Sequence, residues 1–202
     1  MARRTGSADS ATRALLLDAA ERLLLDEGYA AVTSRRVSAE AGVKPPLVHY
    51  YFRTMDDLFV ALYRRGADAG LARARAAVTE ERPLEAVWQV LADPRGAKFT
   101  LEFVALANHR KAIRAEIARD ADQVRELQLA AVRAELQRLG ISEDDVPPPV
   151  LLLVLAGVGQ VLRIEQGLGV TGGHEEAVAF VERTLRELSD GRDAGLRRTS
   201  RR

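Results

Sequence analysis

The stretch that most constrains the fold is residues 33–53, where two short helical patterns are separated by only a few residues. Thr33 is a favourable N-cap for the first helix, and Gly42 can adopt the positive φ that ends a helix and turns the chain. Pro45 and Pro46 suit the first turn of a second helix, because a missing N–H costs nothing there. This spacing predicts a helix-turn-helix motif.

The side chains of this motif divide into an inner and an outer set. Val37, Ala41, Val48 and Phe52 recur at helical spacing and can hold the two helices together. The outer set has the chemistry of a DNA reader, since cations and hydroxyls bond phosphates while proline and leucine carbons contact thymine methyls. The predicted DNA-binding residues are Thr33, Ser34, Arg35, Lys44, Pro45, Pro46, Leu47, His49, Tyr50, Tyr51 and Arg53.

A helical hairpin whose aromatic residues are all core is the structural alternative for this stretch. His49, Tyr50 and Tyr51 span nearly a full helical turn, so they cannot all point inward. The DNA-reading interpretation is therefore favoured.

The whole chain has the composition of an ordinary globular protein. Its 202 residues, 47% of them hydrophobic, are enough for one mid-sized domain or two small ones. The absence of cysteine excludes disulfides, thiolate metal ligands and thiol catalysis, and it fits a cytoplasmic location. The longest apolar run, 146–158, is expected to be too short to span a bilayer, and the polar start of the chain predicts no signal peptide.

Charge is unevenly distributed although the net charge is only +1. Residues 1–75 have a balance of +3, residues 76–189 of −5 and residues 190–202 of +3. A basic N-terminal third joined to an acidic middle is typical of a DNA-binding head on a body that does not bind DNA.

Apolar residues recur at intervals of three and four rather than two, which predicts an all-α fold. Glycine, proline and capping signals delimit about nine helices. The expected helices cover 10–27, 34–41, 47–53, 56–78, 83–92, 94–108, 111–139, 150–167 and 174–188. The expected domains are a flexible basic arm (1–9), a three-helix DNA-binding head (10–55), a ligand-binding and dimerisation body (56–189) and a disordered basic tail (190–202).

The chain resembles the TetR family of bacterial transcriptional regulators, most strongly over residues 10–63. The resemblance is carried by Ala19-Ala20-Glu21-Arg22-Leu23, Gly28-Tyr29, Val32-Thr33, Ala41-Gly42-Val43, His49-Tyr50-Tyr51-Phe52 and Asp57-Leu58-Phe59. Two departures, Lys44-Pro45-Pro46 before the third helix and Thr54 before the fourth, leave the operator sequence open.

The resemblance implies that the body binds a small-molecule effector and that the last two helices form a homodimer. Such a dimer would place two third helices about 34 Å apart on a double-stranded, palindromic operator. The apolar body favours a hydrophobic or amphipathic effector. Candidate ligand-binding residues, each of which core packing also explains, are Trp88, Phe99, Phe103, Leu106, His109, Gln128, Gln160 and Arg163.

The three histidines, His49, His109 and His174, are far apart in sequence and lack metal-ligand or catalytic spacing, so we predict no enzyme activity, no metal and no cofactor. The expected function is a repressor that leaves its operator when a ligand binds. An architectural or ligand-independent DNA binder and an activator are the alternatives.

Overall fold

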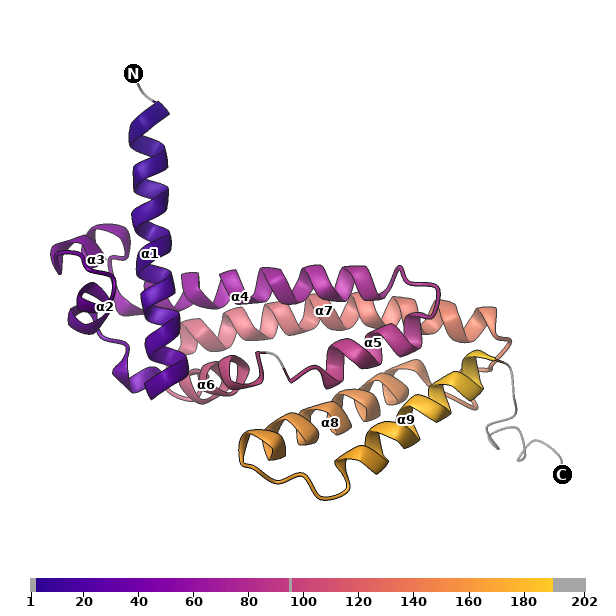
Figure 1. The fold of residues 1–202 in the computed structure, drawn as a ribbon. Helices are drawn as coiled ribbons and strands as arrows, with labels where there is room; N and C mark the ends of the chain where they lie inside the picture. The colour runs from indigo at the N-terminus through magenta and orange to yellow at the C-terminus, as the bar shows by residue number, and fades with distance from the viewer. Residues whose placement is uncertain (1–2, 95, 191–202) are drawn as a thin grey trace, which may run out of the picture. The chain divides into compact units, whose positions relative to one another are not determined.

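The computed structural model describes residues 3–94 and 96–190, and within these ranges the regular secondary structure consists of helices alone. The prediction of an all-α fold with nine helices is confirmed for the described residues. The helices are α1 (Arg3–Glu27), the 3₁₀ turn η1 (Tyr29–Ala31), α2 (Ser34–Glu40), α3 (Pro46–Tyr51), α4 (Met55–Ala77), α5 (Pro83–Ala92), α6 (Ala97–Ala107), α7 (Lys111–Arg138), α8 (Pro148–Gly167) and α9 (His174–Ser189) (Figure 1).

Helix α1 differs from its prediction because it begins at Arg3, inside the arm expected over 1–9. Residues 1–2 of that arm and residues 191–202 of the predicted tail lie outside the described ranges. The described chain divides into two compact units. Unit 1 comprises the residues up to Ala69 together with Lys98–Asp120, and unit 2 comprises Gly70–Ala97 together with the residues from Ala121 onward.

Unit 1 is built around an apolar core in which α1, α2, α3 and α4 are joined by α6 and the start of α7. In α1, Leu16, Ala20, Leu23 and Leu24 lie at helical spacing and are buried, with Leu16 and Leu24 fully enclosed. Phe103 of α6 is also fully buried, and its ring centroid lies 4.6 Å from that of Phe99 and 5.2 Å from that of Tyr63. Helix α6 is therefore part of the same core as the three N-terminal helices.

Ion pairs at the surface of unit 1 join α4 to its neighbours. Arg65 Nη1 lies 2.6 Å from Asp18 Oδ1 on α1, and Arg64 Nη2 lies 2.7 Å from Glu116 Oε1 on α7. The hydrogen bond from Arg64 lowers the pKa of Glu116. Exposed pairs of this kind contribute little individually, so the apolar core remains the main source of stability.

Unit 2 consists mainly of α5, α8 and α9 with the later part of α7. Its core contains the fully buried Trp88 of α5 together with Leu155 of α8 and Leu185 of α9. Helices α5 and α8 come very close at Gly159, where a Cβ atom, if one were present, would lie 2.5 Å from the main-chain oxygen of Leu91. Only glycine fits this contact, because the opposing atom belongs to the backbone and cannot swing away.

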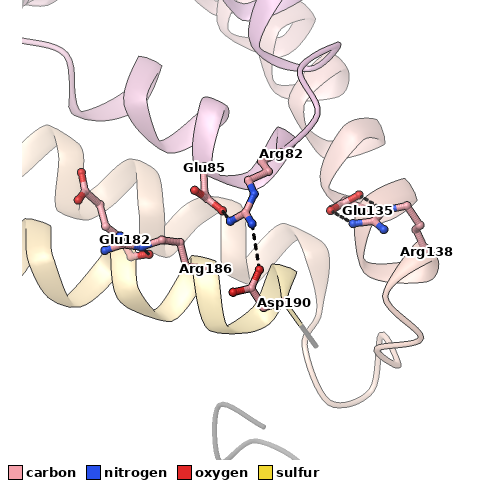
Figure 2. Close-up of polar contacts among 7 residues, drawn as sticks. All are labelled: Arg82, Glu85, Glu135, Arg138, Glu182, Arg186 and Asp190. Carbon is pink, nitrogen blue, oxygen red and sulfur yellow. Dashed lines mark hydrogen bonds and ion pairs between the residues drawn. The ribbon is translucent and has the colours of Figure 1, made fainter. Parts of the chain in front are cut away.

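Polar contacts hold the helix ends of unit 2 together (Figure 2). Arg82, the N-cap residue of α5, donates hydrogen bonds to Glu85 Oε1 at 2.9 Å and to Asp190 Oδ1 at 3.0 Å. The first turn of α5 is thereby tied to the end of α9. On α7, the buried Glu135 receives two hydrogen bonds from Arg138, at 2.8 Å and 2.7 Å, which satisfy both carboxylate oxygens.

Helix α8 is 20 residues long and contains an 18-residue window with a mean hydropathy of 1.5, so length and composition alone would allow it to cross a membrane. From the sequence, the apolar run 146–158 is expected to be too short to span a bilayer. The helix is longer than that run, because it continues to Gly167 with few charged residues. A single helix of this kind is a weak indication, since core helices of soluble proteins pass the same test. Only 22% of the window is buried, and Leu153, Val154 and Val161 are each more than half exposed.

Replacing Gly159 with alanine tests the close contact between α5 and α8. Although alanine favours the helix by about 1 kcal/mol, we expect overpacking against the Leu91 carbonyl to cost about 1–3 kcal/mol and to lower the free energy of unfolding. Gly70→Ala on α4, where a Cβ would meet only the flexible end of the Arg73 side chain at 4.0 Å, is the matched control and should raise that free energy. Urea titrations measure both changes, and equal stabilisation by the two variants would contradict the contact.

Candidate nucleic-acid interface

The helix-turn-helix predicted over 33–53 is formed by α2 and α3. Thr33 is the N-cap of α2, and its hydroxyl accepts a hydrogen bond from the Arg36 amide at 3.3 Å. Gly42 has a φ of 66°, which ends the helix, and Val43 N then donates to Ser38 O at 2.9 Å. Pro45 is the N-cap residue of α3 and Pro46 its first residue, as the sequence predicted.

The inner set of this motif is buried as expected. Val37, Val48 and Phe52 are at most 3% exposed and belong to the core of unit 1, while Ala41 packs against that core. Because these side chains come from both helices, their burial fixes the position of α3 relative to α2.

The predicted DNA-binding residues lie on α2, on α3 and on the segments that flank them. Exposed members are Thr33, Arg35, Lys44, Pro45, Pro46, His49, Tyr50 and Arg53, whereas Ser34, Leu47 and Tyr51 are half-buried. Tyr50 is 70% exposed, and the Tyr51 ring meets it edge-on with the centroids 5.0 Å apart. Tyr51 also packs against the core, so only part of its surface is accessible.

Acidic groups near this surface are paired with arginines that the sequence prediction did not include. Arg36 donates two hydrogen bonds to Glu27, and this contact lowers the pKa of the Glu27 carboxyl and raises that of Arg36. Arg22 Nε lies 2.8 Å from Glu40 Oε1. These pairs neutralise the carboxylates on α1 and α2 that would otherwise repel phosphate.

Three cations of the motif have no ion pair within the described ranges: Arg35, Lys44 and Arg53. A fourth exposed cation comes from α1, where the Arg13 guanidinium lies 5.2 Å from the centroid of the Phe52 ring, just past the end of α3. Sequence reasoning missed Arg13, because nothing in its spacing indicates that α1 passes the end of α3. The surface can therefore hold an anionic polymer through unpaired positive charge.

The segment that follows α3 is also fixed locally. Thr54 and Asp57 form a reciprocal capping box at the start of α4, in which each side chain accepts a hydrogen bond from the other residue's amide at 3.1 Å. Thr54, one of the two departures from the family pattern, is thus a capping residue in this chain.

The candidate ligand-binding residues are divided between the two units. Phe99, Phe103, Leu106 and His109 belong to unit 1, and Trp88, Gln128, Gln160 and Arg163 belong to unit 2. In unit 1, Phe103 and Leu106 are fully buried core residues, Phe99 packs beside them and His109 is exposed. Their assignment to a ligand site stays a prediction.

Polar groups are enclosed in unit 2. The buried Trp88 Nε1 has no hydrogen-bond partner in the part of the chain that the structure describes, and the Gln128 side chain is also buried. Arg163 donates a hydrogen bond to Gln160 Oε1 at 2.6 Å, and burial lowers the pKa of this arginine while Asp93 opposes that shift. No group of three or more metal-ligating side chains occurs among the described residues.

A pocket of about 370 Å³ lies between α8 and the start of α9. Its walls are largely apolar, with Gly157, Val161 and Ala177 among the lining residues. At its edge His174 Nε2 lies 2.8 Å from Glu165 Oε2, which joins the two helices across their connecting loop. The sequence prediction did not include this pocket, because its walls come from two helices that meet only in the folded unit.

Comparisons with known proteins agree on one family. Residues 16–62 match the model for bacterial regulatory proteins of the tetR family. The HTH-type transcriptional regulator BetI of Rhizobium meliloti is 35% identical over 113 residues, which cover 53% of this chain and 55% of BetI. The HTH-type transcriptional repressor AcnR of Corynebacterium diphtheriae is 29% identical over 182 residues, which cover 88% of this chain and 93% of AcnR.

A solved structure extends the likeness to the whole fold. The multidrug binding protein EbrR, in its complex with imidazole, has a TM-score of 0.59 and 30% identity over 87% of this chain and 93% of its own. EbrR has also been solved with malachite green. The matched family model covers α2 and α3, and the unpaired cations of the motif lie on α2 (Arg35), in the turn before α3 (Lys44) and just after α3 (Arg53). The chain therefore belongs to the TetR family of bacterial transcriptional regulators, and it is a DNA-binding regulator rather than an enzyme.

Proposed function

We propose that this regulator is a cytoplasmic homodimeric repressor that binds a palindromic operator through α2 and α3 and leaves it when a small molecule binds. The observation that carries the proposal is the exposed face of the motif, where Arg35, Lys44 and Arg53 lack ion-pair partners within the described ranges. Repression is supported by AcnR, a repressor similar over most of both chains. The predicted roles of a DNA-binding head (10–55) and an effector and dimer body (56–189) are part of the proposal.

Within the interface, we expect the cations to set the affinity for DNA and the apolar side chains to set the base preference. Arg35, Lys44 and Arg53 contact phosphates and supply most of the affinity, because phosphate neutralisation releases counterions whatever the sequence. Pro45 and Leu47 present carbon atoms at the start of α3 and contact base edges in the major groove. The highly exposed Tyr50 extends from the same helix toward the duplex.

A second copy of the chain covers the apolar face of α8 and α9. This face includes Val150, Leu153, Val154 and Val161 of α8 and Phe180 of α9, all more than half exposed. Apolar patches of this kind on a soluble protein usually mark an interface. A twofold dimer also matches the need of a palindromic site for two reading heads.

The effector is a small organic molecule held by body helices. Support comes from the enclosed polar groups of unit 2, since a buried Trp88 N–H and a half-buried Arg163 can orient a ligand in apolar surroundings. EbrR, which binds malachite green and imidazole, is similar over most of both chains. We propose that ligand binding changes the tilt of α4 and so the spacing of the two heads, with a coupling of about 1 to 3 kcal/mol.

Lys44→Ala tests the phosphate role. Loss of one cation should weaken binding to every duplex by a similar factor and reduce the slope of log affinity against log salt by about 0.9. Fluorescence anisotropy over a salt series measures both quantities, and Lys98→Ala, an exposed lysine on α6, is the matched control. A change confined to one sequence would assign Lys44 to base recognition instead.

Selection of bound sequences from a random DNA pool tests the operator and the dimer together. The wild-type protein should select two half-sites related by twofold symmetry, with centres about one helical turn or a multiple of it apart. Val154→Arg should yield monomers and weaker selection of a single half-site, because the added charge cannot be buried in the interface. Gln123→Arg, exposed on α7, is the control. Monomeric wild-type protein in ultracentrifugation would exclude the proposed dimer.

Effector response is tested on the selected duplex. Binding of malachite green or another ligand found by thermal shift should raise the unfolding midpoint and lower affinity for the duplex by about 5- to 150-fold. Calorimetric titration with and without the duplex measures the coupling in both directions. If a ligand saturates the protein and the duplex affinity stays the same, that ligand is no effector, and a ligand-independent regulator is favoured.

A further inference from the structure

We infer that α6 and the turn after it hold the helix-turn-helix in place by contacts just before α2 and just after α3. Glu102 and Arg110 are the positioning residues. The inference rests on the proposed function only in that it concerns how strongly the motif prefers its operator. All four groups in the two contacts, those of Tyr29, Asp56, Glu102 and Arg110, belong to unit 1.

The first grip is at the entry to the motif. Glu102 of α6 accepts a hydrogen bond from the backbone N–H of Tyr29 at 2.9 Å, across 73 residues of sequence. Tyr29 opens η1, the turn that leads from α1 into α2. A carboxylate bonded to a partly buried amide is a strong contact, because the acceptor is charged and the donor would otherwise lose its solvation.

Gly28 gives the turn its conformation at this contact. Its φ of 84° is a conformation that favours glycine, and a Cβ built there would lie 3.4 Å from Glu102 Oε2. The turn thus places its backbone directly against the carboxylate. The Gly28-Tyr29 pair, noted above as part of the family pattern, gains in this chain a specific polar partner on α6.

The second grip is at the exit from the motif. Arg110, in the turn between α6 and α7, forms an ion pair with Asp56 in the first turn of α4. Its guanidinium also lies 5.2 Å from the centroid of the Phe59 ring. Asp56 follows the capping residue Thr54, so this contact holds the segment that receives the chain from α3.

Both gripping residues are attached to a helix that is itself anchored. Phe103 and Leu106, which lie between Glu102 and Arg110 in the sequence, are fully buried in the core of unit 1. A displacement of α6 therefore moves the entry and the exit contacts together. This route to α2 and α3 does not require a tilt of α4, which distinguishes it from the coupling proposed above.

The experiment compares Glu102→Ala with Glu102→Gln, which keeps an acceptor oxygen, and with Glu126→Ala, an exposed glutamate on α7, as the control for charge loss. Two duplexes are used: the one selected by the wild-type protein and a scrambled duplex of equal length. Glu102→Ala should lose about tenfold in affinity for the selected duplex and stay within about twofold on the scrambled one. Glu102→Gln should recover most of the loss, and Glu126→Ala should match the wild type.

Amide exchange provides a readout independent of DNA. The Tyr29 amide should exchange about tenfold faster in Glu102→Ala than in the wild type, while amides in the middle of α4 keep their rates. Equal losses on both duplexes, or an unchanged Tyr29 exchange rate, would overturn the inference. If the wild-type protein prefers no sequence, the proposed function fails instead, and the Tyr29 exchange rate alone decides whether Glu102 grips the turn.

Discussion

The DNA-reading helix of this protein cannot fold by itself, and the rest of unit 1 follows from that constraint. Helix α3 has six residues, whereas isolated helices shorter than about 12 residues are marginal in water. Its position therefore depends on the burial of Val48 and Phe52 against α1, α2 and α4. The same core contains Phe103 and Leu106 of α6, so a helix far along the chain supports the motif that reads DNA.

The helix-turn-helix was predictable because its signals are local. Thr33, Gly42 and the two prolines each act on residues within one turn of themselves, and all take the structural roles expected of them. The body was less predictable, because apolar spacing identifies helices without specifying which unit they join. The candidate ligand-binding residues show this, because Phe103 and Phe99 join the core of unit 1 whereas Trp88 joins the core of unit 2, and no local signal separates them. Arg13 and Arg36 were missed since their contacts link residues distant in sequence.

Electrostatics at the DNA-binding face depends on pairing rather than on composition. The chain has nearly equal numbers of acidic and basic residues, and its net charge of +1 says little about affinity for DNA. Arg22 and Arg36 form ion pairs with the nearby carboxylates of Glu40 and Glu27, so these carboxylates do not pair with the other cations of the motif. Exposed pairs add little to folding stability, but here they leave the exposed surface of the motif with an excess of unpaired positive charge.

The contact between Gly159 and the Leu91 carbonyl has a consequence for engineering. Helices α5 and α8 pack so closely at Gly159 that a shift of either helix along its axis would bring a side chain against the main chain of the other. The contact therefore fixes the register of the two helices. A chimeric protein that takes α8 from a relative must therefore take α5 from the same relative, even when the two helices are stable in that relative. The pair, rather than the single helix, is the unit that can be exchanged.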